Sequence, residues 1–267
     1  MILLRSILYN LAFYVVSVAY VVVCSPLLLG PRSWAMAALQ SHARSCLWLM
    51  RRIVGTRLEV RGREKLPAGA ALIASKHQSA WDTFGLVPIF HDPCFVMKAE
   101  LLKIPLYGWF CRKFEHIVVH RDKPAAALRG MIRTARDRAA AGRHIIIFPE
   151  GNRRSPGAPP DYKSGVIALY EGLKLPCYPV ALNSGLFWPR RQFLRMPGTL
   201  IVEILDPIPP GLPRAEFRRH LEAVIEAATA RLIETADAPD ALARMAGKTV
   251  SGTAVQAAPM GKPDERA

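Results

Sequence analysis

The chain has 267 residues, 51% of them hydrophobic, which is enough to bury one sizeable core. Its 36 Lys and Arg against 21 Asp and Glu give a net charge of +15, and such a field attracts nucleic acid or anionic lipid head groups. The five cysteines show no CxxC pair. They therefore indicate reduced thiols and argue against a disulfide framework or a cysteine metal site.

The first 55 residues have the composition of a membrane anchor. From Ser6 to Gly30 there is no charged residue, and about 20 apolar residues suffice to cross a bilayer core. This segment favours lipid over nucleic acid as the partner of the positive charge. The stretch 33–54 has the pattern of a second, amphipathic helix on the membrane surface. A spanning helix and a helical hairpin in one leaflet are both compatible with this pattern. Basic and aromatic residues follow the apolar run and place that side in the cytoplasm: Arg32, Trp34, Arg44, Trp48, Arg51 and Arg52.

Residues 56–235 alternate short β-rich runs with helical patterns, which predicts an α/β domain with a layered mixed sheet flanked by helices. Helices are predicted over 123–141, beginning near Pro124, and over 213–235. From residue 236 to 267 periodicity disappears, and a disordered tail is predicted. The predicted strands are 58–60, 70–75, 94–98, 116–120, 144–148, 177–182 and 200–205.

The first candidate for chemistry follows the predicted strand 70–75. His77 stands at the strand end with Asp82 five residues later. In this arrangement the carboxylate can hold one imidazole nitrogen and leave the other as a proton acceptor, which suits a general base. Alone the pair is unspecific, because a helix-capping Asp and a hydrogen-bonded His have the same spacing.

A second candidate follows the predicted strand 144–148, which runs into a Gly- and Pro-bounded turn. Arg153 and Arg154 are adjacent on this turn, and the planar guanidinium fork suits a phosphate. A solvated charged turn is the alternative reading of this cluster alone.

Four blocks in a fixed order resemble the glycerolipid acyltransferase family, whose members include 1-acylglycerol-3-phosphate acyltransferases. The blocks lie between about residues 70 and 184. Two positions depart from the family's pattern: Asn152 replaces the usual Thr, and Lys76 replaces a frequent Asn. The matching residues are His77 with Asp82; Lys98-Ala99-Glu100-Leu101 with Ile104-Pro105, Gly108 and Arg121; Phe148-Pro149-Glu150-Gly151 with Arg153; and Val180-Ala181-Leu182-Asn183 after Pro179.

The resemblance implies transfer of a fatty acyl group to the sn-2 hydroxyl of lysophosphatidic acid, giving phosphatidic acid. It implies His77 as the base and Asp82 as its orienting carboxylate. The acceptor phosphate would bind Arg153 and Arg121, with Lys98 a weaker candidate. The resemblance also assigns Glu150 and Gly151 to acceptor binding. We see no G-x-S-x-G nucleophile elbow, and a thioester donor requires no covalent enzyme intermediate.

The expected partners are acyl-CoA or acyl carrier protein as donor, lysophosphatidic acid as acceptor, and membrane lipids, with no nucleic acid. We expect no metal and no cofactor. The expected location is the bacterial inner membrane, with the catalytic domain facing the cytoplasm. Alternatives are another lysophospholipid or lyso-aminolipid acceptor, and a non-catalytic membrane-bound phospholipid-binding module.

Overall fold

The computed structural model of the chain describes residues 1–119 and 124–237. Seven strands form one sheet in the order β1-β7-β6-β2-β5-β3-β4. Each neighbouring pair in this order is parallel except β6 with β7, which is antiparallel. The mixed sheet and all seven predicted strands are thus confirmed. The strands are β1 Thr56–Arg61, β2 Ala71–Ser75, β3 Cys94–Lys98, β4 Ile117–Val119, β5 His144–Ile147, β6 Cys177–Leu182 and β7 Gly198–Ile204.

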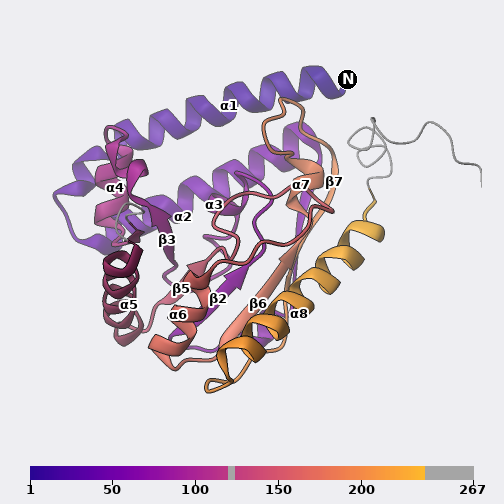
Figure 1. Ribbon diagram of the computed structural model, residues 1–267. Coiled ribbons are helices and arrows are strands. Elements are labelled where there is room, and N and C mark those ends of the chain that lie inside the picture. Colours follow the sequence, from indigo (N-terminus) through magenta and orange to yellow (C-terminus); the bar gives the residue numbers. More distant parts are fainter. Residues whose placement is uncertain (120–123, 238–267) are drawn as a thin grey trace, which may run out of the picture.

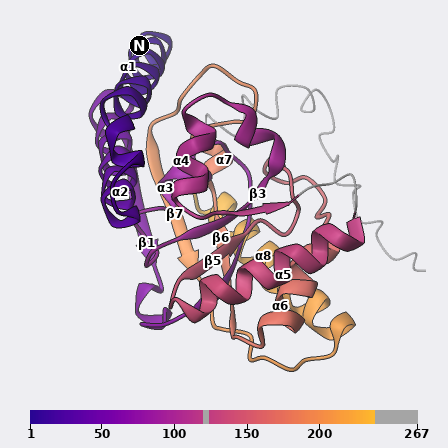
Figure 2. The ribbon, with the colours of Figure 1, turned by 90° about the vertical axis from the view of Figure 1, so that its left-hand side faces the viewer.

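Helices cover both faces of this sheet. The antiparallel pair α1 and α2 lies on one face, and α5, α6 and α8 lie on the other (Figures 1 and 2). The helices predicted at 33–54, 123–141 and 213–235 are confirmed as α2, α5 and α8. The α2 helix continues as a short π-helical segment, Met50–Val54. The helices are α1 Ile2–Val23, α2 Arg32–Leu49, α3 Asp82–Gly85, α4 Tyr107–Lys113, α5 Pro124–Ala140, α6 Ser164–Leu173, α7 Ser184–Phe187 and α8 Arg214–Glu234.

The central strand β2 shows why the sheet needs helices on both sides. All five of its residues are buried. Ala71 and Ile73 pack into the core that also contains residues of α2, whereas Leu72 and Ala74 pack into the core formed with α5, α6 and α8. A strand buried on both faces reads as a continuous apolar run, and this explains the composition of the segment.

The helical pair at the N-terminus is tied to the rest of the chain by polar contacts as well as packing. The Ser6 hydroxyl accepts a hydrogen bond from the Arg195 backbone N–H (2.9 Å), and the Asn10 amide donates to the Phe193 carbonyl (3.0 Å). At the start of α2, Arg32 forms an ion pair with Asp92 at 2.6 Å. These contacts hold the hairpin against the α/β sheet.

The opposite side of α1 is apolar and exposed. α1 is the one helix among the described residues that is long and apolar enough to cross a membrane. By its length and composition, α1 is suited to association with a membrane. The predicted tail 236–267 lies outside the described residues apart from its first two positions. The exposed large apolar side chains of α1 are Leu3, Leu4, Ile7, Leu8, Leu11, Tyr14, Val15, Val18, Val22 and Val23, which we call the apolar stripe.

Candidate active site

The topology brings the four sequence blocks to one edge of the sheet. β6, β2, β5 and β3 are consecutive and parallel, so their carboxyl ends lie together, which is where open α/β sheets place their sites. His77 follows β2, Lys98 ends β3, the Phe148 block follows β5, and Asn183 follows β6. Segments more than 100 residues apart in sequence therefore meet at this edge.

His77 and Asp82 form the hydrogen-bonded pair that the sequence predicts. The distance between His77 Nδ1 and Asp82 Oδ2 is 2.8 Å. Because the carboxylate accepts, Nδ1 carries the hydrogen and Nε2 is left as the proton acceptor. The imidazole stacks on the Phe148 ring, with centroids 3.9 Å apart and planes inclined by 15°. The ring is therefore fixed in orientation by one hydrogen bond and one stacking contact.

Asp82 is fully buried and receives hydrogen bonds from several groups. Oδ2 accepts from the backbone N–H of Gln78 (2.8 Å) and of Ser79 (2.9 Å) as well as from His77. The Ser184 hydroxyl donates to the other oxygen, Oδ1. These hydrogen bonds compensate the carboxylate for the water that it loses on burial. Ser184 was not among the residues expected from sequence.

Two glycines allow the loops to come this close. Gly185 donates its backbone N–H to the Gln78 side chain (3.0 Å), and a Cβ on Gly185 would lie 2.7 Å from Pro156 and 3.0 Å from Gln78. Gly151 has φ of +63°, a left-handed conformation that favours glycine. The turn that carries the arginines therefore depends on a glycine at position 151.

The arginine turn presents its two guanidinium groups differently. Arg153 is exposed, and no ion pair of its side chain occurs among the described residues. Arg154 instead pairs with Asp161. The Lys98 ammonium donates to the Asn152 side chain at 2.8 Å, which joins the second block to the third. Arg121 lies outside the described residues. The turn thus offers Arg153 to a ligand, with Lys98 beside it.

Glu150 lies beneath this turn, in a buried ionic cluster. Its carboxylate accepts from the Lys76 ammonium (3.0 Å), which also contacts Glu226 of α8 (2.7 Å). Tyr162 donates to the same Glu226 carboxylate at 2.9 Å. Burial raises the pKa of Glu150, and the neighbouring Lys76 opposes that shift. Glu150 therefore contacts Lys76, one of the two positions at which the sequence departs from the pattern that it resembles.

Replacing Ser184 by Ala tests whether the Ser184 hydroxyl stabilises the Asp82 carboxylate. We expect a loss of about 1.5–3 kcal/mol in the free energy of unfolding, because a buried carboxylate loses a donor. Turnover should fall as well, since Asp82 then fixes the imidazole less firmly. Thermal unfolding and steady-state kinetics measure both. Ser155→Ala, an exposed serine on the neighbouring loop, is the matched control, and equal behaviour of the two variants would contradict this role.

The charged and polar groups at this edge suit an anionic ligand and a proton transfer. Among residues 1–119 and 124–237, no group of three His, Cys, Asp or Glu side chains lies close enough to hold a metal ion. The pair of His77 and Asp82 places an acceptor nitrogen at this edge, and Arg153 with Lys98 places positive charge there.

Comparison with known proteins agrees with this arrangement. The sequence model of the Acyltransferase family matches residues 57–183. The chain is 37% identical over 166 residues, 62% of its length, to a 1-acyl-sn-glycerol-3-phosphate acyltransferase of Pseudomonas aeruginosa, covering 65% of that protein. It is 32% identical over 131 residues, 47% of its length, to a lyso-ornithine lipid O-acyltransferase of Rhodobacter capsulatus, covering 42% of that protein. The chain thus spans less than two thirds of the curated relatives it matches.

A solved structure has the same fold over most of the chain. The crystal structure of the 1-acyl-sn-glycerophosphate acyltransferase PlsC from Thermotoga maritima superimposes with a TM-score of 0.73 and covers 87% of this chain and 98% of that one, at 22% identity. The shared fold includes the mixed sheet and the N-terminal apolar helix. The chain is thus similar to acyltransferases over residues 57–183 and in its sequence relatives, and it shares the fold of the solved structure.

Proposed function

We propose that this protein transfers a fatty acyl group from a thioester donor, acyl-CoA or acyl carrier protein, to the sn-2 hydroxyl of lysophosphatidic acid. The observation that carries the proposal is the His77–Asp82 pair at 2.8 Å, close in the fold to an exposed arginine on a glycine-dependent turn. The likeness to 1-acyl-sn-glycerol-3-phosphate acyltransferases supports the choice of acceptor.

In the proposed reaction His77 Nε2 takes the proton of the acceptor hydroxyl while that oxygen attacks the thioester carbonyl. The new C–O bond forms, the C–S bond breaks, and the leaving thiolate receives the proton from the imidazolium. Asp82 stabilises the imidazolium through Nδ1. A positioned base contributes about 10²- to 10⁴-fold, so the remaining acceleration comes from holding both substrates together.

The acceptor phosphate is proposed to bind Arg153 and Lys98, with Arg121 as a further ligand from the second block. Arg153 is exposed, whereas Arg154 is paired with Asp161. Glu150 and Gly151 are proposed to support acceptor binding by shaping the turn. Glu150 does this through its contact with Lys76, and Gly151 through its left-handed backbone.

Replacing Arg153 by Ala tests this assignment. We expect the KM for lysophosphatidic acid to rise about 10- to 100-fold, because a charge-assisted hydrogen bond of 1.5–3 kcal/mol is lost. The turnover number at saturating acceptor should change little. Formation of labelled phosphatidic acid is measured with both donors. The control is Arg133→Ala, an exposed arginine of α5. An unchanged KM in the Arg153 variant would contradict phosphate binding there.

A second acceptor class has an observation in its favour. The likeness to the Rhodobacter capsulatus lyso-ornithine lipid O-acyltransferase makes a lyso-aminolipid a candidate acceptor. That likeness covers less of this chain and at lower identity than the likeness to the Pseudomonas aeruginosa protein. Offering both acceptors in one competition assay discriminates them. Preferential acylation of the lyso-aminolipid would replace the proposed acceptor and leave the proposed base unchanged.

We also propose that the hairpin of α1 and α2 lies in one leaflet of the bacterial inner membrane. The sheet edge that carries His77, Lys98 and Arg153, which we call the catalytic edge, then faces the cytoplasm. Tyr9 and Phe13 pack on Trp188, with ring centroids 5.7 and 5.2 Å apart. The α/β domain is packed along one side of α1. If α1 entered the hydrocarbon over its full length, polar backbone groups of that domain would enter the bilayer with it. The apolar stripe on its other side suits shallow immersion.

Replacing Val15 and Val18 together by Asp tests this placement. Both are exposed on the apolar stripe, so folding should be retained while binding to lipid vesicles falls at least about tenfold. Each burial of a Val side chain is worth about 1.5 kcal/mol or more. Co-sedimentation with vesicles measures the loss, and Val15→Ile with Val18→Ile, which keeps both side chains apolar, is the control. Undiminished sedimentation of the Asp variant would contradict immersion of the stripe.

A further inference from the structure

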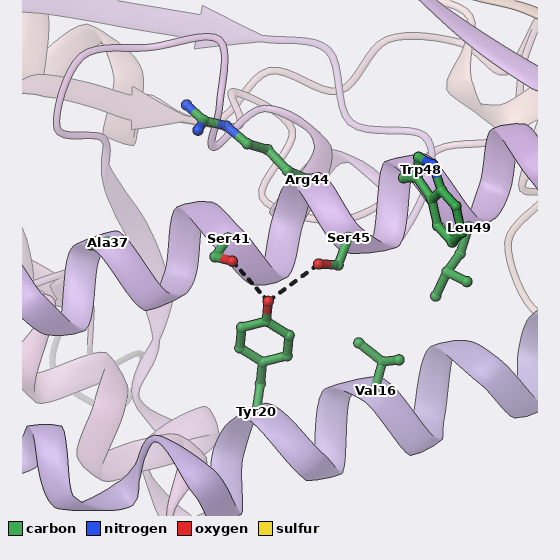
Figure 3. Close-up of a pocket in the computed structure, with 8 residues that line it drawn as sticks. All are labelled: Val16, Tyr20, Ala37, Ser41, Arg44, Ser45, Trp48 and Leu49. Carbon is green, nitrogen blue, oxygen red and sulfur yellow. Dashed lines mark hydrogen bonds between the residues drawn. The ribbon is translucent and has the colours of Figure 1, made fainter.

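An open groove of about 550 Å³ lies between α1 and α2, apart from the four loops of the candidate active site. None of its lining residues belongs to the sequence blocks. Figure 3 shows that Tyr20 points from α1 toward α2, and that Val16 and Leu49 both project into the space between the helices. The lining residues are Val16, Tyr20, Ala37, Ser41, Arg44, Ser45, Trp48 and Leu49.

The lining combines hydroxyl groups with apolar surface. The Tyr20 hydroxyl lies 2.8 Å from the Ser41 hydroxyl and 3.2 Å from that of Ser45 (Figure 3). Val16, Leu49 and the Trp48 ring supply the apolar part. Phospholipids are amphiphilic in the same way, with hydrogen-bond acceptors on the phosphate and an adjoining hydrocarbon chain. The groove therefore offers complementary surface to both parts of one lipid.

The charge of this region is positive without local compensation. Arg44 is exposed, and its side chain makes no ion pair within the described part of the chain. The first acidic residue of the sequence is Glu59, so neither helix of the hairpin contains a carboxylate side chain. The groove consequently favours an anionic ligand over a zwitterionic or cationic one.

The position of the groove selects a lipid over a free phosphate. It lies on the hairpin that carries the apolar stripe, and Trp34 and Trp48 of α2 are 58% and 57% exposed. Tryptophans of this kind sit at the head-group level of a bilayer. In the orientation proposed above, the hydroxyls and Arg44 lie where lipid phosphates are concentrated.

We infer that the α1–α2 groove is a binding site for one anionic membrane phospholipid, separate from the catalytic edge. The lipid phosphate binds the hydroxyls of Ser41 and Ser45, and an acyl chain lies along Val16 and Leu49. The Arg44 side chain, which extends away from these hydroxyls in Figure 3, turns toward the phosphate when the lipid binds. The inference rests on the proposed membrane placement of the hairpin. Occupation of this site holds the two helices together from the membrane side and gives the protein a preference for acidic membranes.

The test is retention of lipid by the full chain, measured by native mass spectrometry after extraction into mild detergent. The protein is taken from vesicles containing equal amounts of phosphatidylglycerol and phosphatidylcholine. We expect one phosphatidylglycerol to be retained in preference, and Arg44→Gln and the double variant Ser41→Ala, Ser45→Ala to retain it at least about tenfold less. Arg51→Gln, an exposed arginine close by that does not line the groove, should retain it as the unaltered protein does.

Each other result overturns the inference. Equal losses in Arg44→Gln and Arg51→Gln mean that general positive charge, not a site, attracts acidic lipid. Equal retention of both lipids removes the head-group preference, and displacement by inorganic phosphate at millimolar concentration means a site for free phosphate. The measurement is repeated with His77→Ala. Retention there with loss of acyl transfer separates this site from the proposed reaction, so either hypothesis can fail without the other.

Discussion

His77→Ala is expected to lower the turnover number for acyl transfer by about 10²- to 10⁴-fold, the range that a positioned general base contributes. At the edge that carries the four sequence blocks, the His77 imidazole combines an acceptor nitrogen with a carboxylate partner, Asp82, at 2.8 Å. The KM for the acceptor should change little, because Arg153 and Lys98 remain. Single-turnover and steady-state assays with labelled lysophosphatidic acid measure the effect.

The matched control is His220→Ala, an exposed histidine of α8, which should leave turnover unchanged. Thermal unfolding shows whether the fold survives in both variants. Asp82 keeps three of its donors in the His77 variant: the backbone N–H groups of Gln78 and Ser79 and the Ser184 hydroxyl. A large loss of stability is therefore not expected, and full activity of a folded His77→Ala protein would remove His77 as the base.

Lys76→Met is expected to lower the free energy of unfolding by about 3–5 kcal/mol, the cost of breaking a buried ion pair by removing one partner. The Lys76 side chain is 3% exposed and the Glu150 side chain 0% exposed. Without the ammonium, the buried Glu150 carboxylate is left beside the Glu226 carboxylate, whose side chain is 26% exposed. Denaturant unfolding in detergent measures the change.

A double-mutant cycle with Glu226→Gln tests whether the loss of stability comes from the contact between Lys76 and Glu226. The combined variant should lose less stability than the sum of the single losses, because neutralising Glu226 removes one of the two uncompensated charges. Lys65→Met is the control: its partner Asp206 is 88% exposed, so about 1 kcal/mol or less is expected. Additive losses in the cycle would show that Lys76 and Glu226 are not coupled.

The sheet could be predicted closely from the sequence because its strands are short apolar runs between turn residues. The α6 helix, Ser164–Leu173, was not expected: it is 10 residues long and contains two glycines, Gly165 and Gly172, which weaken a helical pattern. The short helices α3, α4 and α7 were likewise not expected. They begin within or beside the sequence blocks, where the chain turns to bring functional residues together.

The candidate site was only partly predictable for a different reason. His77 and Asp82 are five residues apart, so their spacing alone suggested a contact. Ser184 and Glu226 contact Asp82 and Lys76 across 102 and 150 residues of sequence, and no local pattern indicates such pairs. One signal could have indicated such a residue: Lys76 directly follows a buried strand, and buried lysines are almost always paired.

The attachment of the N-terminal hairpin has a thermodynamic consequence. Tyr9, Cys46, Met50 and Val54 are fully or almost fully buried in the same core as Ile73 and Trp81, so the hairpin and the sheet share one interior. In the proposed membrane placement, the bilayer acts on folding as a ligand that binds the native state through the apolar stripe. Removing residues 1–55 would expose this core to water, and the lipid environment contributes to the stability of the catalytic edge as well as to its location.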